Sequence, residues 1–144
     1  MPILAHATKA VTDRMPKVIS PGVHAIIDYS TAGAFFAMGA LFWRRNKRAA
    51  VSSIICGAAE AITAATTDYP GGVVKAMSFT THGRIDVGMA ALVGSLPGIM
   101  KFSDEPEARF FGMQAIAMAG VTGLTDFERS GRRKQLKRLE EQAA

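Results

Sequence analysis

The sequence predicts an all-α fold, a bundle of four transmembrane helices made from two tandemly duplicated helical hairpins. Hydrophobic residues make up 49% of the 144 residues and charged residues only 20%. Lys and Arg are concentrated in a few blocks, and between the blocks lie apolar runs close to the length of about 20 residues that crosses a bilayer. Polar residues of the first half also recur at a fixed distance in the second half. Together these observations predict the fold class.

The first 20 residues (1–20) form a separate N-terminal segment. They lack the basic start, apolar core and small-residue cleavage site of a secretory signal peptide. Their apolar residues are spaced as on one face of a helix, with charged residues among them. A helix lying on the membrane surface is therefore one interpretation of this segment.

Four apolar runs follow within a predicted membrane domain (21–127); they cover residues 23–43, 49–67, 83–100 and 108–125. The first run ends in Leu-Phe-Trp and is followed by four basic residues, which is how spanning helices commonly end. No charged residue lies between Ser30 and Trp43, whereas a helix of a soluble bundle would carry a charged stripe. The runs therefore predict membrane insertion.

The distribution of Lys and Arg predicts the orientation. Four spans would place both termini and the central loop on one side, which carries eleven Lys and Arg, while the other side carries six. The positive-inside rule then places both termini in the cytoplasm and the protein in the cell (inner) membrane, although the basic block at 44–48 opposes this orientation. The basic tail (128–144) would face anionic lipid headgroups or simply fix the topology.

An internal repeat relates the two halves. A shift of 58 residues places His24 on His82 and Asp28 on Asp86, and it aligns a Thr-Asp-aromatic triplet in each half. The repeat units, 18–72 and 76–130, are helical hairpins in tandem. Because an even number of spans separates them, the expected symmetry is a pseudo-twofold axis along the membrane normal.

The segments VHAIIDY, ATTDYPGG, THGRIDVGMAALVGSLPGIMKFSDE and GLTDF carry a resemblance to a known family. Over residues 23–127 the chain resembles small bacterial integral membrane proteins of the SPW-repeat type. The resemblance implies two tandem hairpins in a membrane, each opened by His-x-x-x-Asp, and it implies no particular activity. The chain departs from the family at the Ser-Pro-Trp signature, where the second copy has Ser95-Leu96-Pro97 and the first has Ala37-Met38-Gly39.

The proposed topology gathers six ionisable residues at one membrane level, namely His24, Asp28, Asp68, His82, Asp86 and Asp126. Ionisable groups within spans are costly and face partners or cavities. One interpretation is interhelical hydrogen bonding completed by Thr67 and Thr125. The others are a hard-metal shell, a haem held by the two histidines, and proton or ion handling.

Glu60 is an intramembrane acid near the middle of the second run, and its counterpart in the repeat is Met118. Such a carboxyl indicates either a hydrogen bond to a backbone or hydroxyl oxygen, such as that of Thr63, or a proton-relay or lumen-lining role. In the same run Ser53, Gly57 and Ala61 form a small-residue face suited to close helix packing. This face would join the hairpins to each other, to another copy or to another membrane protein.

The sequence contains no phosphate-binding glycine loop and no nucleophile elbow. Its single cysteine, Cys56, excludes an intramolecular disulfide and a CxxC metal site. We therefore expect no enzyme activity, no assigned cofactor, and no nucleic-acid partner. The expected function is a structural or accessory role in the bilayer, packing against other membrane proteins. The alternative is a small proton-handling, ion-handling or metal-binding membrane protein that uses the His/Asp residues and Glu60.

Overall fold

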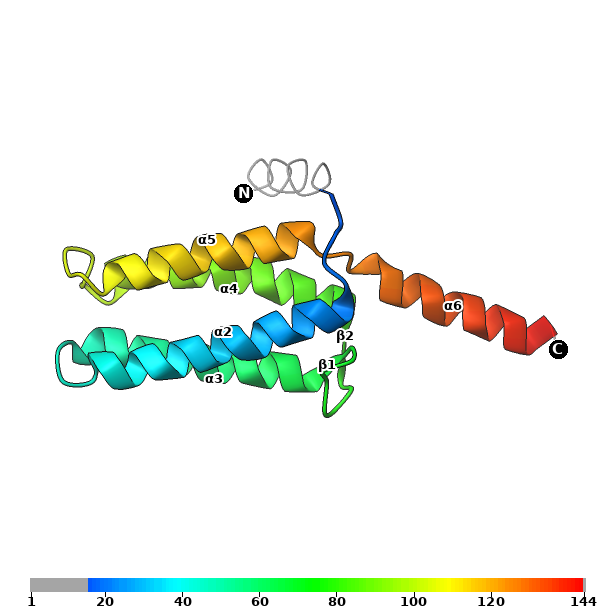
Figure 1. Cartoon of the computed structure of the whole chain (residues 1–144), viewed down its shortest axis with the longest axis horizontal. Helices are drawn as coiled ribbons and strands as arrows, with labels where there is room; N and C mark the ends of the chain where they lie inside the picture. The colour runs from blue at the N-terminus through cyan, green and yellow to red at the C-terminus, as the bar shows by residue number, and fades with distance from the viewer. Residues whose placement is uncertain (1–15, 144) are drawn as a thin grey trace.

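A computed structural model describes residues 16–143 and is mostly helical, as predicted (Figure 1). The helices of this part are α2 (Pro21–Phe42), α3 (Lys47–Thr66), α4 (Phe79–Ile99), α5 (Ala108–Leu124) and α6 (Glu128–Ala143). Each of the four apolar runs lies in one of the first four helices, with its ends within four residues of the helix ends. Residues 1–15 of the segment predicted as an interfacial helix (1–20) lie outside the described residues.

Helices α2 and α4 begin in the same way. Ser20 is the N-cap of α2, where its Oγ accepts a hydrogen bond from the backbone N–H of Val23 at 3.4 Å. Ser78, 58 residues later, caps α4 by accepting from the N–H of Thr81 at 3.1 Å. A serine hydroxyl satisfies one of the backbone donors that a helix start leaves free. The two caps fix where each of these helices enters the fold.

The four helices form two antiparallel hairpins, α2 with α3 and α4 with α5, and α6 projects away from them (Figure 1). At one end the hairpin loops are joined by Asn46. Its Oδ1 caps α3 by accepting from the N–H of Ala49 at 3.1 Å, and its Nδ2 donates to Glu105 Oε2 at 3.0 Å. Arg48 also pairs with Glu105, at 3.2 Å.

Substituting Asn46 with alanine is expected to lower the free energy of unfolding by about 1–2 kcal/mol, because it removes a helix cap together with a contact between the hairpin loops. Asn46→Ser keeps a capping hydroxyl and loses only the bond to Glu105, so it should lose less. Thermal unfolding of the purified variants compares them. Equal stability of the alanine variant and the wild type would contradict this account of the loop.

The opposite end contains two short strands that the all-α prediction did not include. β1 (Thr67–Asp68) pairs in parallel with β2 (Met77–Ser78), so the end of α3 lies beside the start of α4. An isolated parallel bridge joins Ile19 to Thr125, so the end of α5 lies beside the start of α2. The end of each hairpin is therefore held against the beginning of the other.

The helices differ in how they fit a membrane span. Among the described helices, α2 and α3 have the length and apolar composition to cross a bilayer, and only 33% and 44% of their apolar stretches are buried. Core helices of soluble proteins and signal sequences can share these properties. Helix α4 carries Arg84 and Asp86 near its start, and α5 has 17 residues.

Candidate functional site

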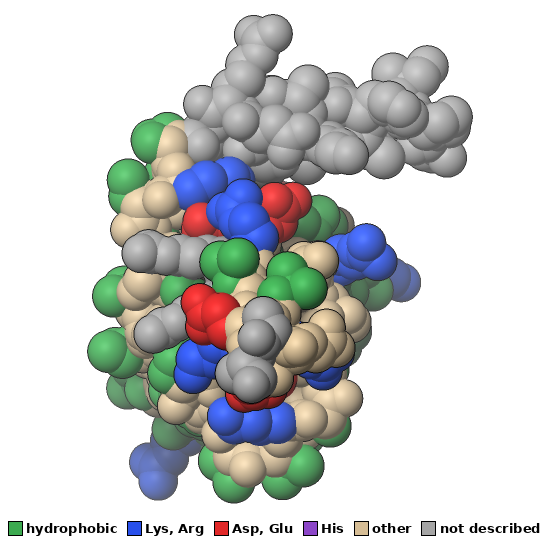
Figure 2. Space-filling view, turned by 90° about the vertical axis from the view of Figure 1, so that its right-hand side faces the viewer, with side chains coloured by type: hydrophobic (Ala, Val, Ile, Leu, Met, Phe, Trp, Pro, Cys, Tyr) green, Lys and Arg blue, Asp and Glu red, His purple; other side chains and the backbone are tan. Residues whose placement is uncertain are grey.

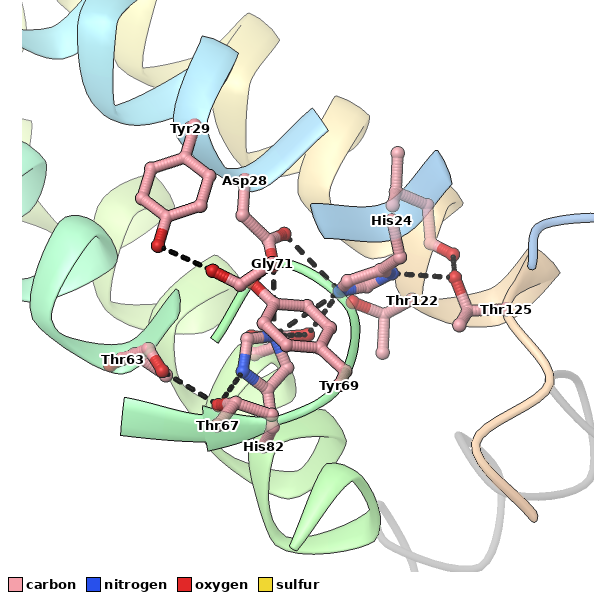
Figure 3. Close-up of polar contacts among 12 residues, drawn as sticks. His24, Asp28, Tyr29, Thr63, Thr67, Tyr69, Gly71, His82, Thr122 and Thr125 are labelled. Carbon is pink, nitrogen blue, oxygen red and sulfur yellow. Dashed lines mark hydrogen bonds and ion pairs between the residues drawn. The ribbon is translucent and has the colours of Figure 1, made fainter. Parts of the chain in front are cut away.

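Two histidines meet where the hairpins come together. His24 on α2 and His82 on α4 each lie one turn into their helix, and each is only 1% exposed. Their Nε2 atoms are 3.2 Å apart (Figure 3). Figure 2 looks at the end of the molecule from which α6 projects, where Lys, Arg, Asp and Glu side chains gather, and neither histidine reaches this surface.

Two buried aspartates surround these nitrogens. Asp28 places Oδ1 3.2 Å from His24 Nε2 and Oδ2 3.3 Å from His82 Nε2. Asp86 places Oδ2 3.2 Å from both Nε2 atoms. Each aspartate is four residues after a histidine, so it lies one turn away on the same helix face. We call His24, Asp28, His82 and Asp86 the central cluster.

A threonine hydroxyl lies beside the Nδ1 atom of each imidazole. Thr67 Oγ1 donates its proton to the carbonyl oxygen of Thr63 at 2.6 Å, so towards His82 Nδ1, at 2.8 Å, it acts as an acceptor. Thr125 Oγ1 likewise donates to the carbonyl of Val121 at 2.7 Å and lies 2.8 Å from His24 Nδ1. When the threonine protons lie on these carbonyls, both Nδ1 atoms carry hydrogen. In a neutral imidazole, both Nε2 atoms would then present lone pairs to the carboxylates.

Tyr69 completes the cluster and was not predicted from the sequence. Its hydroxyl donates to Asp28 Oδ2 at 2.7 Å, and the residue is buried (Figure 3). Burial and this hydrogen bond to Asp28 raise the pKa of Tyr69 well above its usual value, so the hydroxyl remains a donor. The residue 58 positions later is Phe127, which has no hydroxyl. Asp86 therefore has no tyrosine equivalent.

Tyr69→Phe is expected to destabilise the protein by about 1–3 kcal/mol, because a buried carboxylate loses a hydrogen-bond donor. Tyr29→Phe is the matched control: its hydroxyl donates to the Gly71 carbonyl at 2.9 Å in an exposed position, so its loss should cost well under about 1 kcal/mol. Thermal unfolding of both variants tests the difference. If Tyr29→Phe lowers the free energy of unfolding as much as Tyr69→Phe does, the hydrogen bond from Tyr69 to Asp28 contributes no more than an exposed one.

Glu60 on α3 faces the central cluster across a cavity. The residue is 4% exposed, and its Oε2 has no hydrogen-bond partner among the described residues. The cavity, of about 40 Å³, is also lined by Met118 and Thr122 of α5 and by three of the cluster residues. Its volume exceeds the roughly 10–15 Å³ that one water requires. Glu60 Oε2 therefore does not form the predicted hydrogen bond to Thr63. Glu60 instead shares the cavity with residues of the central cluster.

The structure does not bring Asp68 and Asp126 into the central cluster, which corrects the six-residue prediction. Both are half-buried at the helix ends, where Asp68 pairs with Lys75 at 3.8 Å and Asp126 with Arg132 at 3.6 Å. Their neighbours Thr67 and Thr125 point inward instead. In extended backbone successive side chains point to opposite sides, so only one residue of each Thr-Asp pair can reach the cluster.

The small-residue face of α3 packs inside its own hairpin. A Cβ at Gly57 would lie 3.1 Å from the carbonyl oxygen of Ala32 and from Phe35 Cβ, both on α2. Ser53 is fully buried and Ala61 is half-buried. The prediction that Gly57 binds another protein is therefore wrong, because α2 already packs against this glycine.

The central cluster does not fit the haem interpretation. A haem held by two histidines places the porphyrin between their nitrogens, and no ring fits between Nε2 atoms that are 3.2 Å apart and flanked by carboxylates. What the four side chains can do is share protons or hold a small cation.

No family model, curated protein or solved structure matches this chain. The site is therefore interpreted from its own geometry. Its members come from both hairpins, they are buried, and their acceptor atoms converge on one point. Such an arrangement serves to join helices or to bind a cation.

Proposed function

We propose that the chain is a multi-pass protein of the cell (inner) membrane with a structural or accessory role, in which the central cluster joins two hairpins. The single observation that carries this proposal is an inverted distribution of side chains. The four residues of the central cluster and Glu60 are buried, while the large aliphatic residues Ile26, Ile55 and Ile116 are 68%, 62% and 76% exposed. Hydrocarbon solvates such an outer surface, and the polar groups find their partners inside.

The proposal includes four spans, both termini in the cytoplasm, and an origin by duplication of an SPW-repeat type hairpin. Contacts that occur in pairs support the duplication. His24 contacts Thr125, and His82 contacts Thr67. His82 lies 58 residues after His24 and Thr67 lies 58 residues before Thr125, so the two contacts are equivalent under the repeat. The bridge between Ile19 and Thr125 corresponds in the same way to the pairing of Met77 with Thr67.

Cysteine labelling tests the location. In a Cys56→Ser background, a cysteine placed in the α2–α3 loop should react with a membrane-impermeant thiol reagent from outside intact cells. A cysteine in α6 should react only after the membrane is opened. The protein should also stay in the membrane pellet after alkaline extraction. Release by alkaline extraction, or labelling of both sites from the same side, would contradict the four-span proposal.

The accessory role requires a partner surface other than the Gly57 face. Gly112 and Gly120 on α5 are suited to the test, because a Cβ at either position would meet no atom within 4 Å. Gly112→Leu and Gly120→Leu should therefore leave the fold intact and weaken association with membrane partners or further copies. Gly57→Leu should instead disrupt the hairpin itself. Cross-linking in native membranes reports association, and unchanged cross-links in both outer variants would argue against partners on this face of α5.

A second candidate function, proton or ion handling, is favoured by Glu60, whose free oxygen faces the cavity beside the cluster. A relay would require this carboxyl, whereas a structural role would tolerate Glu60→Gln. Proton flux into vesicles containing the purified protein distinguishes the two: flux that falls in Glu60→Gln supports the relay, and no flux in the wild type removes it.

A further inference from the structure

We infer that His24, His82 and Asp86 bind one divalent transition-metal ion of the zinc class, which acts as the cation that bridges the two hairpins. This inference deepens the proposed structural role and rests on it. The three side chains supply one ligand atom each, and among the described residues these atoms all lie within 4.8 Å of one another in a buried position.

The first support is the shape formed by the ligand atoms. His24 Nε2, His82 Nε2 and Asp86 Oδ2 form a triangle whose three sides are each 3.2 Å. Ligand atoms about 2.0 Å from a tetrahedral zinc ion lie about 3.3 Å from one another, so this triangle matches one face of that coordination shell.

The second support is the shortage of hydrogens at that centre. Thr67 and Thr125 each accept from a histidine Nδ1, so the neutral form of each imidazole has a bare Nε2. Both oxygens of Asp86 are buried, and neither receives a hydrogen bond among the described residues. Lone pairs that face each other in a buried site repel unless a cation lies between them. A metal ion with its positive charge at the centre satisfies all of them at once.

Neighbouring groups resemble the outer shell of a metal site. The threonine hydroxyls hold the metal-facing tautomer of both imidazoles, a role that carboxylates and carbonyls play in many zinc sites. Asp28 places one carboxylate oxygen near each Nε2 atom, and the hydroxyl of Tyr69 orients this carboxylate by donating a hydrogen bond to it. Imidazole and carboxylate ligands without thiolate suit zinc and the other divalent first-row ions. The cavity beside Glu60 gives the ion room for a water ligand.

Metal titration of the full-length protein tests the inference. Protein purified in mild detergent is stripped with a chelator, dialysed, and titrated with Zn²⁺ in competition with a chromophoric chelator. About one ion per chain is expected to bind. Asp86→Asn and His82→Asn should each weaken binding by at least about 100-fold, because each removes a ligand. Tyr69→Phe should weaken it by about 10–100-fold through Asp28. Tyr29→Phe is the control and should bind as the wild type does.

Cobalt gives an independent readout. Co²⁺ bound at this centre should show visible absorption bands that disappear in Asp86→Asn, while circular dichroism confirms that the variant remains helical. Should Asp86→Asn fail to fold, Tyr69→Phe against Tyr29→Phe carries the test.

Two results would overturn the inference. One is a wild-type protein that takes up well under one ion per chain from Zn²⁺, Co²⁺, Mn²⁺ or Fe²⁺. The other is metal binding whose affinity is equal in all the variants. Neither result decides the structural role, which is measured separately by the stability of the metal-free wild type against metal-free Asp86→Asn. A loss of stability in that comparison would leave the cluster as a proton-bridged link between the hairpins.

Discussion

Gly72→Ala is expected to destabilise the protein by about 3 kcal/mol or more. A Cβ at this position would overlap the backbone carbonyl oxygen of Thr67, and backbone atoms cannot move aside as a flexible side chain can. Gly72 also closes the turn by donating its N–H to the Tyr69 carbonyl at 3.0 Å. Any relief of the overlap therefore displaces two residues that contact the central cluster.

The control for this substitution is Gly88→Ala on α4, where a Cβ would meet no atom within 4 Å. Alanine favours a helix over glycine by up to about 1 kcal/mol, so this variant should be as stable as the wild type or slightly more stable. Thermal unfolding in detergent compares the two. If both glycine variants unfold at the same temperature, the close approach of Gly72 to Thr67 is not a constraint on the fold.

Removing the Asp28 carboxylate should cost about 3–5 kcal/mol, because the buried Tyr69 hydroxyl loses its acceptor and the site loses a charged group 3.2 and 3.3 Å from the two imidazole nitrogens. Asp28→Leu makes this change in full. Asp28→Asn keeps an acceptor oxygen for Tyr69 and loses only the charge, so it should fall between Asp28→Leu and the wild type. Unfolding followed by circular dichroism and by tyrosine fluorescence measures both the global loss and the local one.

Replacing all four residues of the central cluster with leucine separates stability from function. Buried ion pairs exchanged as a set for apolar groups often leave stability unchanged or higher, whereas loss of one member is costly. The fourfold variant should therefore be more stable than Asp28→Leu alone. A fourfold variant less stable than the single one would mean that the polar contacts contribute more to folding than their desolvation costs.

The helices and half of the candidate site could be predicted because they depend on local patterns. Apolar runs end where charge or Pro-Gly begins, and these ends agree with those of the helices. His24 and Asp28 share a helix face by their spacing of four, and the repeat places His82 and Asp86 in the same relation. The tertiary partners of these residues depend on how the hairpins meet, which no local pattern contains.

The errors at the helix ends have a physical cause that the sequence contained. Helix α3 stops at Thr66, and the next residues are extended, so alternate side chains point to the same side. Thr67 and Tyr69 therefore face the cluster together, and Asp68 faces away. Glu60 is seven residues before Thr67, close to two helical turns, so the two share a face. The change from helical to extended backbone after Thr66 decides which of these side chains face the central cluster.

The orientation of Gly57 could not be predicted, because a small-xxx-small pattern indicates close approach without identifying the helix that approaches. Gly57 contacts α2, the nearest helix along the chain. Gly112 and Gly120 of α5 are small as well, but a Cβ at either would meet no atom within 4 Å, so their surroundings and not their spacing distinguish them from Gly57.

The crossed arrangement of the two hairpins has a consequence for synthesis of the chain. The Nδ1 atom of His24 bonds to a threonine 101 residues later. Thr67 already donates to Thr63, and it gains its second partner only once His82 has been made. A chain that stops after α3 would hold polar groups with no partner, a state that costs free energy in an apolar medium. The first hairpin alone is therefore less stable than the same hairpin in the full chain, because its polar groups gain their partners only when the second hairpin packs against it.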